Sequence, residues 1–270
     1  MVFHGTFELP LSFTNYHSSI SGCRGPISTM KPIPSLEIYL RRTTSGIIDA
    51  ETQLGELFAF TQRIGSFSPL LQNWFLATGN SEPEARMYEA FDRGGPSHAA
   101  LAVVRTASKG MNDIRSISIW NGAELSAESA GMTSRVNSLD RPDTIELRLR
   151  LAPQVADWKI PVDWLKFAVP IWRPKCATFA PYWYNEKKVF KDRPGAGWMV
   201  YLPVVLTSKQ VPEARALIPV IGEKNRPIGT IVVSVIDEQF SDENPDHVRA
   251  ANAIEIRLVD LDILPRFSDL

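Results

Sequence analysis

The segment Asp143-Thr144-Ile145-Glu146-Leu147-Arg148 has the residue types that come closest to a catalytic constellation. A metal-dependent nuclease holds its divalent cation with an Asp and a Glu-x-Lys motif on adjacent strands. Here Asp143 and Glu146 lie three residues apart on one extended segment, so their side chains point to opposite faces. Arg148 stands where the lysine belongs, and a guanidinium is a poor proton-transfer group. The sequence therefore predicts no nuclease site in this segment.

Other residues of catalytic or metal-binding types are too few or too far apart to form a second candidate site. The chain has four histidines: His4, His17, His98 and His247. None has a cysteine or paired carboxylates at metal-ligand spacing, and His98 is expected to lie in a loop. Gly195-Ala196-Gly197 lacks the third glycine and the following helix of a dinucleotide fingerprint. Cys176 has no activating neighbour and is expected in the core. We predict no catalytic residue, no metal site and no cofactor.

Acidic residues are concentrated at the C-terminal end of the chain. From Asp237 onward there are nine acidic residues and three arginines, a net charge of −6, so residues 1–236 carry +5 of the total −1. A protein that binds nucleic acid directly does not usually concentrate acid at one end. An acidic segment suits a basic protein partner, and the alternative is a solvated surface without a partner. The candidate partner-binding residues are Asp237, Glu238, Asp242, Glu243 and Asp246.

The composition is that of an ordinary globular chain, with 44% hydrophobic and 22% charged residues among 270. No run approaches twenty apolar residues, and the first basic residue is Arg24, so neither a membrane span nor a secretory signal is predicted. Two cysteines cannot form a disulfide framework. We therefore expect a cytoplasmic protein that does not contact a membrane.

The elements that must position a binding surface begin after a loose N-terminal arm, residues 1–34, which has no sustained hydrophobic period. Residues 36–41 alternate apolar and polar side chains and predict a strand. Asp49 is a candidate N-cap for a helix that ends at Gly65. A second helix is predicted over residues 81–91, and strands over residues 99–105 and 114–120.

A similar order recurs about half-way along the chain. Residues 144–150 alternate as residues 36–41 do, and a helical stretch broken at Pro161 follows over residues 153–171. Trp183 lies 109 residues after Trp74, the same offset that separates Leu36 from Ile145. The offset indicates two related halves, residues 35–142 and 143–270. Chance recurrence and one continuous domain are the alternatives.

Short strands are predicted to dominate the rest of the chain, over residues 198–206, 215–221, 229–236 and 254–259, with a helix that starts at Asn244. Helices near the start of each half with strands elsewhere favour an α+β fold. We expect a mainly antiparallel sheet with a few helices.

A series of weak aromatic motifs resembles a known family over residues 31–262. The motifs are Leu36-Glu37-Ile38-Tyr39-Leu40-Arg41-Arg42, Trp74-Phe75-Leu76, Tyr88-Glu89-Ala90-Phe91 and Ser118-Ile119-Trp120-Asn121-Gly122. Their order is similar to that in the immunity protein 52 family, which are antitoxins of bacterial polymorphic-toxin and type VI secretion systems. The resemblance implies a cytoplasmic inhibitor that binds a cognate secreted toxin, often a nuclease with a restriction-endonuclease fold. It carries over no catalytic residue.

The leading hypothesis is therefore an antitoxin whose acidic segment competes for a nuclease by mimicking phosphate charge. One alternative is an enzyme with a site assembled from distant residues: Asp140, Asp143, His98 and Arg105. A deep pocket with convergent polar groups would favour it. Another is a structural or assembly subunit, which a large apolar exposed patch would favour. The sequence does not predict the oligomeric state.

Overall fold

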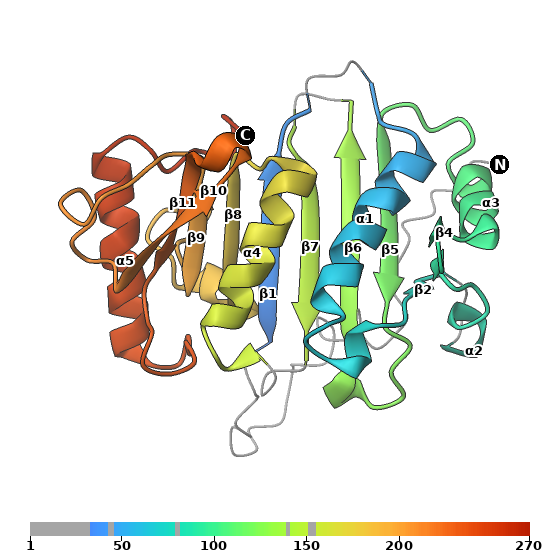
Figure 1. Ribbon diagram of the computed structural model, residues 1–270, viewed down its shortest axis with the longest axis horizontal. Coiled ribbons are helices and arrows are strands. Elements are labelled where there is room, and N and C mark those ends of the chain that lie inside the picture. The colour runs from blue at the N-terminus through green and yellow to red at the C-terminus, as the bar shows by residue number, and fades with distance from the viewer. Residues whose placement is uncertain (1–32, 43–45, 79–81, 139–140, 151–154) are drawn as a thin grey trace, which may run out of the picture.

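The alternating segment at Leu36 forms strand β1 (Pro34–Leu40), which lies near the middle of a nine-stranded antiparallel sheet (Figure 1). The computed structural model describes residues 33–42, 46–78, 82–138, 141–150 and 155–270, so nearly all of the predicted N-terminal arm lies outside the described residues. β1 pairs with β7 (Asp143–Leu149) on one side and β8 (Cys176–Pro181) on the other. Ile38 is opposite Ile145 and Ala177, which buries a continuous apolar row.

The sheet has the strand order β10-β11-β9-β8-β1-β7-β6-β5-β2. Its other strands are β2 (Phe75–Leu76), β5 (Ile114–Trp120), β6 (Ala130–Asn137), β9 (Met199–Leu202), β10 (Ala216–Ile221) and β11 (Pro227–Val233). Strands β3 (Phe91–Asp92) and β4 (Gly95–Pro96) form a separate pair. Short 3₁₀ helices span Pro69–Leu71, Ser126–Glu128, Tyr182–Glu186 and Glu223–Asn225. The predicted α+β class with a mainly antiparallel sheet is confirmed.

Helices α1 (Ala50–Ile64) and α4 (Lys159–Trp172) cover one face of the sheet (Figure 1). Asp49 caps α1 as predicted, because its carboxylate accepts the Thr52 N–H at 2.8 Å. Phe60 of α1 packs against Trp172 of α4 with ring centroids 5.1 Å apart. The predicted break at Pro161 is wrong, because this proline lies in the first turn of α4, where its missing N–H leaves no helical hydrogen bond unmade.

The opposite face is covered at one end of the sheet by helix α5 (Pro245–Asp260). Ile254 and Leu258 of α5 form a second buried cluster with Cys176 of β8, Val200 of β9 and Val232 of β11. Apart from the buried Trp120, the side chains that β5, β6 and β7 direct to this same face are half-buried or exposed. Both faces are therefore apolar at the α5 end, whereas the other end presents polar side chains.

Two predicted strands are helices in the structure. Residues 99–105 belong to α3 (His98–Ala107), whose N-cap Ser97 accepts the Ala100 N–H at 3.0 Å, so His98 begins a helix and is not a loop residue. An apolar run without a clear period does not distinguish a strand from a helix. Residues 254–259 lie inside α5. There Glu255 is buried and Ile256 is 46% exposed, whereas the alternation of the predicted strand would bury Ile256 and expose Glu255. The helix predicted over 81–91 is only α2 (Glu82–Ala85).

The two predicted halves contribute to one sheet, because β1 from the first half lies between β7 and β8 from the second. The bounds of the elements repeat the offset of 109 residues. β1 begins at residue 34 and β7 at 143, while α1 begins at residue 50 and α4 at 159. A common origin of the halves stays a prediction.

Glu255 fixes α5 to the neighbouring loops through a buried carboxylate that is 1% exposed. Its Oε1 accepts from the Tyr184 hydroxyl at 2.5 Å and the Ala196 N–H at 2.9 Å, and its Oε2 accepts from the Val189 N–H at 2.8 Å. Burial and the adjacent Glu255 carboxylate raise the pKa of Tyr184, so the phenol keeps its proton and donates. A carboxylate is tolerated in the interior when donors satisfy it in this way.

We expect Glu255→Ala to lower the free energy of unfolding by about 3–5 kcal/mol, because three donors, two of them buried, lose their acceptor. Equilibrium urea unfolding measures the change. The matched control is Glu186→Ala, an exposed glutamate in the same region, which should change the stability by less than about 0.5 kcal/mol. Equal losses in the two variants would contradict the role given to Glu255.

Candidate functional site

The acidic segment predicted to bind a partner connects β11 to α5. Asp237, Glu238, Glu243 and Asp246 are exposed, whereas Asp242 is only 7% exposed. The Asp242 carboxylate faces Lys187, with Nζ 3.9 Å from Oδ2, and burial raises the pKa of Asp242. Four of the five predicted carboxylates are therefore exposed at the surface, and Asp242 is mostly engaged within the fold.

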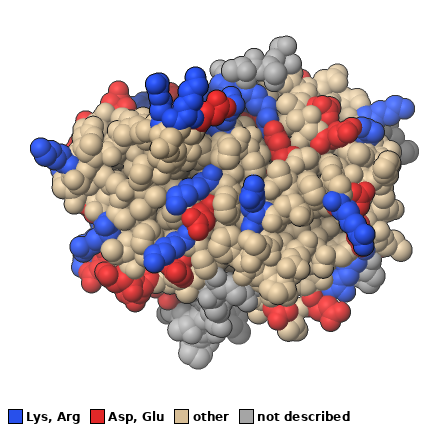
Figure 2. Space-filling view, viewed as in Figure 1, with Lys and Arg blue, Asp and Glu red and all other residues tan. Residues whose placement is uncertain are grey.

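The segment is held in place by hydrogen bonds around the start of α5. The Ser241 N–H donates to His247 Nδ1 at 3.0 Å, so the ring proton is on Nε2, which lies 3.0 Å from the Glu238 carboxylate. The Asn244 side chain accepts the Asp246 N–H at 2.9 Å, and Asp246 forms an ion pair with Arg249. Carboxylates are also favoured near a helix N-terminus. Figure 2 shows acidic side chains gathered at the lower left, whereas the rest of that face mixes both signs.

A charged cluster lies at the middle of the sheet, on the face away from α1 and α4. Glu37 of β1 is directly opposite Glu146 of β7. Glu37 accepts from the Tyr39 hydroxyl at 2.6 Å, while Glu146 pairs with Arg148, whose guanidinium lies 4.2 Å from the Tyr182 ring centroid. Burial raises the pKa of Glu146 above its ordinary value although the paired Arg148 lowers it, and the nearby Glu37 carboxylate adds a smaller increase. The charged side chains of this cluster thus have partners, and one of them, Glu146, is harder to ionise than an ordinary glutamate.

The nuclease-like motif is separated as the sequence predicts. Asp143 is buried beneath α1, where its carboxylate accepts from Arg42 Nε at 2.8 Å and from the Asn137 N–H at 2.7 Å. Glu146 points to the other face of β7. In the described part of the chain, no group of three His, Cys, Asp or Glu residues could hold a metal ion.

The residues of the enzyme alternative have different partners. Arg105 pairs with Glu51 at 3.1 Å, and no hydrogen bond or ion pair among the described residues joins His98 to Asp143 or Arg105. Asp140 lies outside the described residues. Cys176 is fully buried and burial raises its pKa, which fits the predicted core role.

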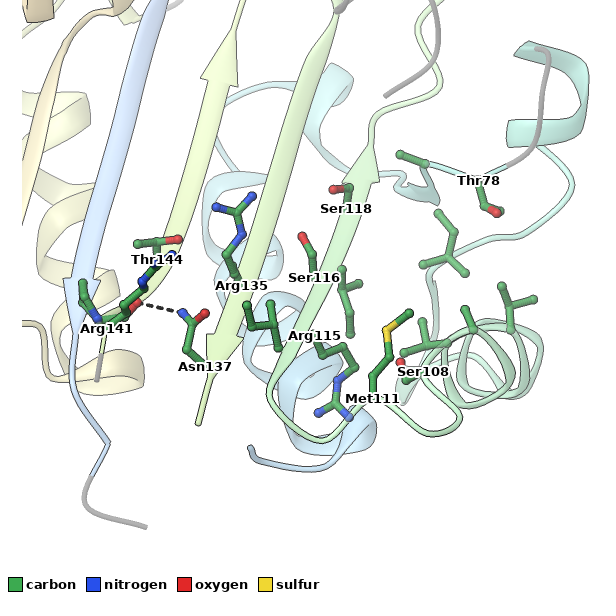
Figure 3. Close-up of a pocket in the computed structure, with 18 of the residues that line it drawn as sticks. Thr78, Ser108, Met111, Arg115, Ser116, Ser118, Arg135, Asn137, Arg141 and Thr144 are labelled. Carbon is green, nitrogen blue, oxygen red and sulfur yellow. Dashed lines mark hydrogen bonds between the residues drawn. The ribbon is translucent and has the colours of Figure 1, made fainter. Parts of the chain in front are cut away.

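A cavity of about 780 Å³ lies beside β5 and extends over β6 and β7 (Figure 3). Its polar wall includes Ser116, Ser118, Arg135, Asn137, Arg141 and Thr144. Its apolar wall includes Val103, Val104, Ala107 and Met111, on and just after α3. No acidic residue lines the cavity among the described residues. The sequence did not reveal this cavity, because it depends on α3, which was predicted as a strand.

Arg115 lines the same cavity but is committed to the interior. It is 8% exposed, its Nε donates to Gln53 Oε1 at 2.8 Å, and its guanidinium also donates to the Ile48 carbonyl. Arg135 and Arg141 are exposed, and no hydrogen bond or ion pair joins either of them to a carboxylate in the described residues. The cavity therefore presents two exposed cations beside an apolar wall, and one of them, Arg135, lies near enough to Glu146 to lower the pKa of that carboxyl.

The immunity protein 52 family model matches residues 51–265. The chain belongs to the immunity protein 52 family. No curated protein matches this family member. Among solved structures, the T6SS protein PA0821 of Pseudomonas aeruginosa matches it with a TM-score of 0.43 and 10% identity, over 83% of this chain and 74% of that chain. A likeness of that size carries no argument about fold or function.

Membership of the immunity protein 52 family gives the chain an immunity-type role. The acidic segment and the cavity beside β5 are accordingly candidate surfaces for a partner. In the part of this chain that the structure describes, helices are too short or too polar to cross a bilayer.

Wild-type protein is expected to lose stability relative to Glu146→Gln as the pH rises above about 4.5, the ordinary Glu value. Because burial and Glu37 raise the pKa of Glu146, the folded chain holds this proton more tightly than the unfolded chain. The unfolded chain binds fewer protons between the ordinary and the raised pKa, so stability declines across that window and then levels off. Urea unfolding of both proteins from about pH 4 to about pH 7.5 measures the difference. A difference that is constant with pH, or that has the opposite slope, would refute this.

Proposed function

We propose that this immunity protein 52 member is an antitoxin that binds a cognate secreted toxin in the cytoplasm and neutralises it, and that the toxin is a nuclease. The family match over residues 51–265 is the observation that carries the proposal. The site geometry supports binding over catalysis. The cavity beside β5 offers hydroxyls and arginines, but no carboxylate or histidine lines it among the described residues. It therefore supplies no acid and base pair.

The charge of the acidic segment supports a nuclease as the partner. A nuclease needs positive potential to hold the phosphate backbone of its substrate. Asp237, Glu238 and Glu243 lie on a segment whose backbone is fixed by Ser241 and His247. Fixed carboxylates compete with phosphate at a basic surface and accelerate the encounter by long-range attraction. Asp242 contributes mainly through its contact with Lys187.

The first test is protection from the toxin. The chain is co-expressed with a candidate toxin domain, chosen as the C-terminal domain of any large protein that a gene adjacent to its own encodes. We expect survival of cells that die with the toxin domain alone, and a stoichiometric complex on co-purification. A toxin domain without its active-site residues serves as the control for expression burden. If the chain neither rescues the cells nor co-purifies with the toxin domain, the antitoxin proposal is wrong.

The second test reverses charge in the acidic segment. The triple variant Asp237→Lys, Glu238→Lys, Glu243→Lys should weaken the complex by about tenfold or more and reduce the dependence of its affinity on salt. The control triple variant Glu89→Lys, Glu124→Lys, Glu223→Lys makes the same change in net charge at exposed positions elsewhere. Calorimetric titration at two salt concentrations measures both effects. Unchanged affinity and unchanged salt dependence in the first triple variant would remove the segment from the interface.

A further inference from the structure

The outer edge of β5 is only partly covered by another strand. β2 pairs with Ile119 and Trp120, and the Ala77 N–H donates to the Ser118 carbonyl at 2.8 Å. Among the described residues, no strand pairs with the remaining edge, residues 114–117. An unpaired strand edge is a template for a further strand.

The direction of the free backbone groups follows from the pairing of Ser118. Its carbonyl points to the outer edge, and its hydroxyl lies 2.9 Å from that of Thr133 across the β5–β6 pair. Such close side chains are typical of a pair that exchanges no backbone hydrogen bonds. Ser116, two residues away and opposite Arg135, has the same orientation. Its N–H and C=O therefore also point outward.

The cavity runs along this edge. Five consecutive residues, 114–118, line it, although alternate side chains of β5 point to opposite faces of the sheet. A space on one face alone would be lined by every second residue. The opposite wall consists of α3 and Met111, so the cavity is a slot between a strand and a helix (Figure 3). Five residues of strand span roughly 17 Å, enough for a short added strand that continues the line of β2.

The two sides of the slot differ in chemistry. Toward the open face of the sheet, Arg135 and Arg141 are exposed, and neither forms an ion pair with a carboxylate within the described residues. Toward α3, the wall is apolar and includes Val104 and Ile117. A strand placed here directs alternate side chains to these two sides.

We propose that the slot is a β-augmentation site that receives an extended segment of the cognate toxin in which apolar and acidic residues alternate. The identity of the partner rests on the function proposed above. Backbone hydrogen bonds to Ser116 supply affinity, and the alternating side chains supply specificity. Carboxylates of the segment meet the guanidinium groups of Arg135 and Arg141, a charge-assisted pairing. The slot lies at the β5 end of the sheet, and although Phe267 also lines the cavity, no residue of the acidic segment does, so the slot is a contact separate from that segment.

Ser116→Pro tests the backbone pairing, because proline removes the outward N–H and leaves the bonds between β5 and β6 in place. We expect its affinity for the toxin domain to fall at least about tenfold, with an unchanged circular dichroism spectrum. The matched control is Ser116→Ala, which keeps the N–H and should bind as the wild type does. In wild-type protein, hydrogen exchange at the Ser116 amide should slow by about tenfold or more in the complex.

The double variant Arg135→Gln, Arg141→Gln tests the charge preference. It should weaken the complex and lower its salt dependence, whereas the control Arg93→Gln, Lys159→Gln, at exposed positions away from the slot, should not. If wild-type protein does not bind the toxin domain, the proposed function itself fails. If wild-type protein binds it, but both slot variants bind equally well and the Ser116 amide stays unprotected, the slot proposal is overturned and the function stands. A dimer of the free chain that Ser116→Pro converts to a monomer would also overturn it, because the occupant would be a second copy.

Discussion

The position of β1 between β7 and β8 is the constraint on which the rest of the structure depends. It is secured at the end of β1 by Arg42, which donates two hydrogen bonds to Glu56 of α1, at 2.7 and 2.6 Å, and one to Asp143 of β7, at 2.8 Å. Trp172 of α4 completes the network through Glu56 at 3.1 Å. Asp143 is buried while Arg42 and Glu56 are half-buried, and charges removed from water to this extent are tolerated when each has partners of good geometry. The end of β1, strand β7 and both covering helices therefore meet in one network around Arg42 and Glu56.

One sheet runs through the whole described fold, and its two ends carry different surfaces. The strands between them hold these surfaces apart. The α5 end presents exposed carboxylates, of which Glu238 is positioned by His247. The β5 end presents Arg135 and Arg141 beside an apolar wall. A partner that contacts both ends must itself be basic in one region and acidic in another. Such a pattern discriminates against a uniformly charged competitor, because either sign alone would meet like charge at one end.

The sequence predicted the elements whose position is set by interactions between residues close together in the chain. The Asp49 cap, the alternating strands at Leu36 and Thr144, and the helix that starts at Asn244 follow from neighbours within a few residues. It failed where distant partners decide. Glu255 is buried because Tyr184, Val189 and Ala196 lie around it, and this reversed the apparent polarity pattern. Strand β8 was not predicted, since its neighbour β1 comes from far along the chain. Strand β6 was not predicted either, although its neighbours β5 and β7 adjoin it in the chain. The slot beside β5 depends on strand order and on α3, so no local motif marks it.

The offset of 109 residues relates one strand and helix to another strand and helix, and the positions of these elements in the sheet show what the repeat builds. The strand and helix that recur, β1 with α1 and β7 with α4, lie side by side at the centre of the sheet. Beyond them the chain follows different routes. After α4 it forms β8 next to β1, whereas after α1 it crosses to β2 at the far edge. Whatever the origin of the repeat, only the strand–helix unit is shared. The acidic segment and the slot beside β5 lie mainly outside that unit, so the recurring spacing belongs to the scaffold, whereas the surfaces proposed for recognition belong to the parts that differ.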